Sequence, residues 1–93
     1  MLTIEEIKQA VNDLAMRYDV AKVDLFGSYA NGTATEMSDA DFLVTFNVEV
    51  PSIFRVMGFQ EELKNALNRP VDVVTIPHTL NIDKVVSIYD RAG

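Results

Sequence analysis

The chain of 93 residues has no cysteine, one histidine, and only eight basic residues against fourteen acidic ones. Without cysteine, disulfides, thiolate nucleophiles and thiolate metal sites are excluded. The net charge of −6 argues against a general basic surface for a nucleic-acid backbone, because that mode of binding depends on clustered Lys and Arg. An acidic protein can still handle nucleotide phosphates through a bound divalent cation, and it can attract a basic protein partner.

Long hydrophobic runs and a secretion signal are also missing. No apolar stretch approaches the roughly 18 to 20 residues that span a bilayer, and the N-terminal MLTIEEIKQA lacks the basic start and apolar core of a signal peptide. We therefore expect a soluble, cytoplasmic protein without membrane contact. With 48% hydrophobic and 24% charged residues, the composition fits one globular domain over residues 1–93.

The chain does contain alternating helical and strand patterns. A capping-box signature, Thr3 with Glu6, predicts a helix over residues 4–18. Strands are predicted over 22–26, over 41–46 with both faces buried, and over 71–76. Residues 28–35 fit a short helical turn.

Two further helices are expected from apolar spacing. The first has a stripe formed by Ile53, Val56, Met57, Leu63, Ala66 and Leu67, and it stops at Asn68-Arg69-Pro70. A last, short helix is predicted from Ile82, Val85, Val86 and Tyr89. This order of elements predicts a small α/β (α+β) fold, in which helices pack on a small mixed sheet.

Three aspartates lie in or beside the predicted strands. Asp39 and Asp41 are two residues apart in an extended segment and project to one face, and Asp72 occupies a strand that could lie beside theirs. Two carboxylates about 4 Å apart repel by roughly 4 kcal/mol at an effective dielectric near 20. Each acid alone fits a solvated turn or strand end. Together they indicate a site for Mg²⁺, which prefers carboxylate oxygens, water and phosphates.

The segment GSYANGTA and the following DADFLV each begin like a common motif, but neither completes it. The glycines of GSYANGTA match a P-loop, but Thr33 stands where the loop requires Lys. DADFLV begins like a calcium loop, but Val44 occupies the obligatory glycine position. The remaining interpretation is a glycine turn at Gly27, where backbone N–H groups and the Ser28 hydroxyl approach an anion at the start of a short helix.

From Gly27 to Phe42, GSYANGTATEMSDADF resembles the Gly-Ser, spacer, Asp-x-Asp signature of the DNA polymerase β-like nucleotidyltransferase superfamily. Within it, the chain is most similar to the minimal nucleotidyltransferase group, and the resemblance implies their fold. It also implies that Gly27 and Ser28 contact the β- and γ-phosphates of ATP. Asp39 and Asp41 would hold two Mg²⁺ ions, and Asp72 would be a metal ligand that helps activate the attacking hydroxyl.

The resemblance extends to a partner. Minimal members typically act as antitoxins that adenylylate a tyrosine of a HEPN-domain ribonuclease, which implies AMP transfer from ATP to such a partner. A non-catalytic binding module that neutralises a partner by contact is the alternative. Many relatives have Gly-Ser-x-Ala-Arg-Gly, whereas Asn31 occupies the Arg position here. Two interpretations are open. Loss of the guanidinium would weaken the binding of triphosphate or partner, or Asn31 would only stabilise the turn.

Three other residues carry less specific signals. His78, the single histidine, is expected to have a loop role rather than a catalytic one. Phe54 falls off the apolar stripe of its helix and is a candidate contact residue, whereas Phe59 is expected in the core.

Overall fold

The computed structural model describes residues 2–35, 37–75 and 85–91. The elements follow the chain in the order α1 (Ile4–Ala15), β1 (Val20–Phe26), α2 (Ser28–Asn31), β2 (Ala40–Phe46), α3 (Ile53–Leu67), β3 (Val71–Val74) and β4 (Val86–Asp90). This confirms the expected fold class, a mixed sheet with helices packed on it.

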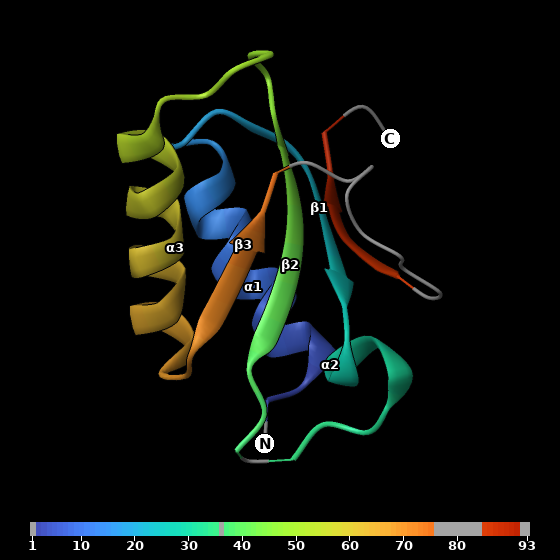
Figure 1. Cartoon of the computed structure of the whole chain (residues 1–93). Helices are drawn as coiled ribbons and strands as arrows, with labels where there is room; N and C mark the ends of the chain where they lie inside the picture. Colours follow the sequence, from blue (N-terminus) through green and yellow to red (C-terminus); the bar gives the residue numbers. More distant parts are fainter. Residues whose placement is uncertain (1, 36, 76–84, 92–93) are drawn as a thin grey trace.

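The four strands form one sheet in the order β3-β2-β1-β4 (Figure 1). Strand β1 runs antiparallel to both β2 and β4, whereas β2 and β3 are parallel. In the view of Figure 1, helix α1 lies behind the sheet and α3 stands to the left beside β3, and the face toward the reader carries neither of them. The two faces of the sheet therefore have different surroundings.

Strand β2 shows this difference along its length. The side chains of Ala40, Phe42 and Val44 are at most 1% exposed and belong to the core under α1 and α3. The alternate residues, from Asp41 to Thr45, are half-buried or exposed and point to the other face. The prediction that this strand is buried on both faces was wrong, because helices cover only one face.

The last element is a strand and not the predicted helix. Val85, Val86 and Tyr89 match helical spacing, but residues 86–90 pair antiparallel with β1, with Leu25 opposite Val86 and Val23 opposite Tyr89. Strand β1 would otherwise present an unpaired edge, and β-branched and aromatic side chains fit a pleated sheet. Tertiary pairing overrides the local pattern here. Ile82, Pro77 and His78 lie outside the described residues.

Helix boundaries follow the capping residues. The Thr3 hydroxyl accepts from the Glu6 N–H at 3.1 Å, which confirms the capping box. Helix α1 ends at Ala15, so the predicted helix over 4–18 was too long. Tyr18 lies beyond the helix, and its hydroxyl donates a hydrogen bond to the Glu62 carboxylate on α3. Helix α3 begins after Ser52 and ends where Asn68 adopts a left-handed conformation, with φ 53°.

Helix α3 does not bury the whole predicted stripe. Phe59 and Leu63 are fully buried, as expected for Phe59, and Leu67 is 6% exposed. Ile53 and Met57 were expected on the buried stripe, but they are 62% and 60% exposed. In the described part of the chain, no helix is long and apolar enough to cross a membrane.

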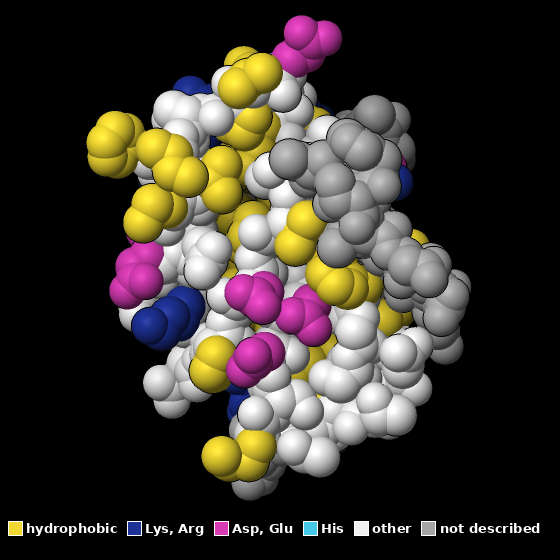
Figure 2. Space-filling model, in the orientation of Figure 1, with side chains coloured by type: hydrophobic (Ala, Val, Ile, Leu, Met, Phe, Trp, Pro, Cys, Tyr) yellow, Lys and Arg dark blue, Asp and Glu magenta, His cyan; other side chains and the backbone are white. Residues whose placement is uncertain are grey.

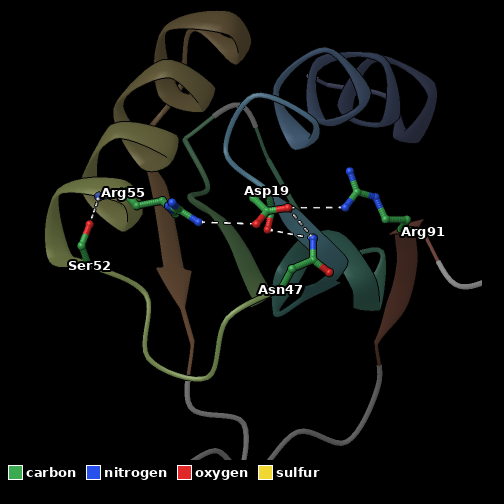
Figure 3. Close-up of polar contacts among 5 residues, drawn as sticks. All are labelled: Asp19, Asn47, Ser52, Arg55 and Arg91. Carbon is green, nitrogen blue, oxygen red and sulfur yellow. Dashed lines mark hydrogen bonds and ion pairs between the residues drawn. The ribbon is translucent and has the colours of Figure 1, made fainter.

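A polar cluster around Asp19 ties the elements together at the end of the sheet where β1 begins (Figure 3). Asn47 Nδ2 donates to Asp19 Oδ1 at 2.9 Å. Arg91 Nη1 lies 3.4 Å from Asp19 Oδ1, and Arg55 Nη1 lies 3.7 Å from Asp19 Oδ2. Because these partners come from the end of β2, from α3 and from the end of β4, Asp19 links four parts of the fold.

Candidate active site

Two of the three predicted acids are direct neighbours across the sheet. In the parallel β2–β3 pair, Asp41 lies opposite Asp72. Neighbouring strands are about 4.8 Å apart, so both carboxylates project from one face over adjacent backbones. Figure 2 shows acidic side chains gathered over these two strands, on the face that α1 and α3 leave open.

The third predicted acid joins them electrostatically. Asp39 precedes β2 by one residue and is exposed. The pKa of Asp41 is raised above its ordinary value, first by burial, then by the charge of Asp72, and then by the charge of Asp39. The charges of Asp72 and Asp39 therefore both act on the Asp41 carboxyl.

The predicted Gly-Ser turn lies against the same cluster. Phe26, the last residue of β1, is opposite Asp41, so the chain reaches Gly27 beside that carboxylate. Gly27 has φ 75°, and a Cβ there would lie 2.4 Å from Asp41 Oδ2. Glycine is needed both for this backbone conformation and for the close approach. Ser28 then begins α2, and the Asn31 N–H donates to the Gly27 carbonyl at 3.0 Å.

Asn31, which departs from the pattern of many relatives, is exposed at the end of α2. Its backbone helps to close the short helix. Its side chain makes no hydrogen bond with any residue that the structure describes. The idea that the Asn31 side chain stabilises the turn therefore has no support in this geometry.

The donor chemistry of the acids fits Mg²⁺. Among the described residues, no Lys or Arg forms an ion pair with Asp39, Asp41 or Asp72. Within that same part of the chain, no three His, Cys, Asp or Glu side chains lie close enough together to hold a metal ion as they stand. Mutual repulsion explains why unneutralised carboxylates stay apart. A divalent cation would supply the missing positive charge and draw their oxygens together.

Sequence reasoning missed one acid on this face of the sheet. Asp24 lies opposite Leu43 and is only 8% exposed. Lys22 Nζ lies 3.6 Å from its Oδ2, so Asp24 has a counterion of its own. The alternation in VAKVDLF contains the signal, because Lys22 and Asp24 share the face opposite Val23 and Leu25.

A glycine turn thus lies directly against a cross-strand pair of acids, Asp41 and Asp72. The sequence pattern of the nucleotidyltransferase domain family matches residues 4–91. The chain therefore belongs to this family of nucleotidyltransferases, which confirms the family and the enzyme class expected from the sequence.

Individual relatives agree with this assignment. The protein adenylyltransferase MntA of Thermococcus cleftensis is 40% identical over 78 residues, which cover 80% of this chain and 78% of that protein. A toxin–antitoxin crystal structure with AMP-PNP superimposes with a TM-score of 0.73 at 21% identity, over 96% of this chain and 74% of that chain. A complex of tri-AMPylated Shewanella oneidensis HEPN toxin with MNT antitoxin superimposes with a TM-score of 0.68 at 16% identity, over 95% of this chain and 73% of that chain. These two structures share the fold.

Proposed function

We propose that this chain transfers AMP from ATP to a hydroxyl, expected to be a tyrosine, of a HEPN-type partner protein, as the antitoxin of a toxin–antitoxin pair. The observation that carries the proposal is the pairing of Asp41 with Asp72 directly beside Gly27. The names of the relatives support it, because one is a protein adenylyltransferase and another is in complex with an AMPylated HEPN toxin. We treat residues 1–93 as a single domain that contributes all of these groups.

Each residue has a separate task in this reaction. The Gly27 backbone and the Ser28 hydroxyl would hold the β- and γ-phosphates, because a glycine turn lets backbone N–H groups approach an anion closely and the hydroxyl is a further donor. Asp39 and Asp41 would hold two magnesium ions, and Asp72 would share one of them. When bound, magnesium supplies the positive charge that stabilises the entering and leaving oxygens of a phosphoryl displacement.

The proposed transfer is balanced in bonds and charge. The acceptor oxygen forms a bond to the α-phosphorus of ATP, and the bond between that phosphorus and the bridging oxygen breaks. Pyrophosphate leaves, and the proton of the acceptor hydroxyl passes to the Asp72 carboxylate and then to solvent. Asp72 is suited to this task because it is exposed at the end of the site and lies beside Asp41.

The test combines the chain, ATP, Mg²⁺ and a HEPN-domain protein of the same organism, followed by measurement of the intact mass of that partner. We expect a mass increase of one or more AMP units, which EDTA abolishes. A stable complex whose partner keeps its original mass would favour neutralisation by contact. Partner mass that increases equally without the chain would also contradict the proposal.

A further inference from the structure

A second surface feature lies on the same side of the molecule as the acids. Five large apolar side chains are exposed along one stretch, from the loop after β2 to the second turn of α3. They form what we call the apolar patch: Val48 (43% exposed), Val50 (87%), Ile53 (62%), Phe54 (84%) and Met57 (60%). Figure 2 shows hydrophobic side chains gathered at the upper left, over the first half of α3. Soluble monomers rarely expose large contiguous apolar patches without a function.

Helix α3 shows why the patch is unusual. Its inner side is fully buried at Phe59 and Leu63, while its first two turns also carry apolar residues on the outer side. A helix that is apolar on both sides is normally covered on both. This is why the sequence pattern placed Ile53 and Met57 in the core. The structure leaves their outer side uncovered in the isolated chain.

A hollow of about 300 Å³ adjoins the patch and shares Val48 with it. Its lining includes Thr45 and Thr75, at the far ends of β2 and β3. Thr45 follows Asp41 by four residues and Thr75 follows Asp72 by three, so at about 3.3 Å per residue the hollow lies roughly 10 to 13 Å from the acids. A partner seated on the patch and in the hollow would therefore have neighbouring residues within reach of the candidate active site.

The charges around the patch select the kind of partner. Glu49 lines the hollow, and the three site aspartates lie farther along the same strands. Arg55 is the only basic residue between 48 and 57, and its Nη1 is directed to Asp19 at 3.7 Å. A second copy of this chain, with a net charge of −6, would bring acidic surfaces together. A partner with Lys or Arg beside apolar side chains complements both features.

We propose that the apolar patch and the adjoining hollow are the docking surface for the acceptor protein, which covers them with an amphipathic segment of apolar and basic side chains. This inference rests on the proposed transfer of AMP to a protein, since it gives that protein a place to bind beside the site. Phe54 is the expected anchor, because it is the largest exposed apolar side chain of the patch and aromatic residues dominate interface energetics.

The experiment uses titration calorimetry to measure the affinity of the whole chain for a HEPN-domain protein of the same organism. Phe54→Ser and Met57→Ser should each raise the Kd at least tenfold. Met16→Ser is the matched control, because Met16 is 75% exposed and lies outside the patch, and it should leave the Kd unchanged. Glu49→Gln should weaken binding a few-fold at low salt and have no effect at high salt. Circular dichroism and melting confirm that each variant is folded.

The outcomes separate docking from catalysis. If the wild type transfers no AMP but the patch variants still lose the partner, the proposed function fails and the docking surface stands. If the wild type modifies the partner and patch variants bind as tightly as Met16→Ser, the docking surface is wrong. A wild-type dimer that Phe54→Ser converts to a monomer would assign the patch to a second copy instead. Absence of any binding at micromolar concentrations would also overturn the proposal.

Discussion

Asp19 and Asp41 stand at opposite ends of the β1–β2 pair and have opposite surroundings. Asp19 precedes β1 and is neutralised within the fold, since two arginines and the Asn47 amide converge on it (Figure 3). Asp41 faces Asp72 and has Asp39 close by, and the described residues provide no cation for them. The contrast indicates that the acid at one end stabilises the fold, whereas the acids at the other end are the ones we propose as ligands of a metal ion.

The largest expected effect is on catalysis. Asp39→Asn or Asp41→Asn should abolish AMP transfer, a fall of at least about 10³-fold, because each removes a carboxylate from the proposed metal site. Partner mass and circular dichroism, measured together, check transfer and fold. Asp19→Asn is the matched variant and should retain transfer, since that residue lies at the other end of the strands. Near wild-type transfer by Asp41→Asn would show that Asp41 is not part of the proposed metal site.

The next effect is on nucleotide binding at the turn beside Asp41. Gly27→Ala should eliminate measurable binding of a non-hydrolysable ATP analogue, because the added Cβ would displace the Asp41 carboxylate and alanine disfavours φ 75°. Ser28→Ala removes only one hydrogen bond to a charged group, so affinity should fall by roughly tenfold. Calorimetric titration gives the order. If Ser28→Ala is the more damaging change, the phosphates bind elsewhere.

Stability should respond to Asp19 in the opposite sense from the site acids. Asp19→Ala loses the Asn47 hydrogen bond and both exposed ion pairs, and it places alanine at φ 57°. We expect a loss of about 1 to 2 kcal/mol, since exposed pairs contribute little and the left-handed conformation costs about 1 kcal/mol. Thermal melting without metal checks this. Asp19→Gly, which tolerates the conformation, should recover part of the loss.

Metal should stabilise the site end of the sheet. A ligand at about 100 times its Kd adds roughly 2.7 kcal/mol to the folded state, and about 1 kcal/mol moves the midpoint of a small domain by some 4 to 8 °C. We expect a rise of several degrees with Mn²⁺ or with Mg²⁺ plus ATP. Asp72→Asn should raise the metal-free midpoint by relieving repulsion, and it should respond less to metal. A wild-type midpoint that ignores Mn²⁺ and Mg·ATP alike would mean that the three acids do not form one site.

The smallest expected effect is on the pH dependence of stability. The contributions of Asp41 and Glu62 to the free energy of unfolding should change with pH in opposite directions. The pKa of Asp41 is raised, so its contribution to stability is present below the unfolded pKa, near 3.8, and is lost as pH rises through the folded value. The pKa of Glu62 is lowered, by its hydrogen bonds with Tyr18 and Arg17, so its contribution is present above the unfolded pKa and is lost as pH falls.

Metal-free melting of two variants against the wild type checks these signs. At neutral pH, Asp41→Asn should melt above the wild type and Glu62→Gln below it. The Asp41 difference should narrow as pH falls toward about 4, because the Asp41 carboxyl then becomes protonated. The Glu62 difference should begin to narrow only below the unfolded pKa of 4.5 and should persist to lower pH, because the pKa of Glu62 is lowered in the folded protein. Differences that stay constant with pH would show that neither carboxyl charge affects stability as inferred.

Much of the site was predictable because its signals are local. Asp39 and Asp41 share a face through the two-residue period of an extended chain. Gly27 is predictable because a strand that turns tightly against a carboxylate needs glycine at the turn. The capping box of Thr3 and Glu6 is likewise closed within one helical turn. Such features depend on neighbours a few residues away, so the sequence alone determined the helix starts, the Gly-Ser turn and the acids.

The tertiary structure decided what depends on partners far along the chain. The register that places Asp41 opposite Asp72 joins residues 31 positions apart, and the arginines of Asp19 come from α3 and from beyond β4. Residues 86–90 became a strand because β1 had a free edge, although their spacing also suited a helix. Ile53 and Met57 have a core-like spacing, yet the sheet lies against the other side of α3. An amphipathic period shows that a side is apolar, but only packing decides whether this chain or a partner covers it.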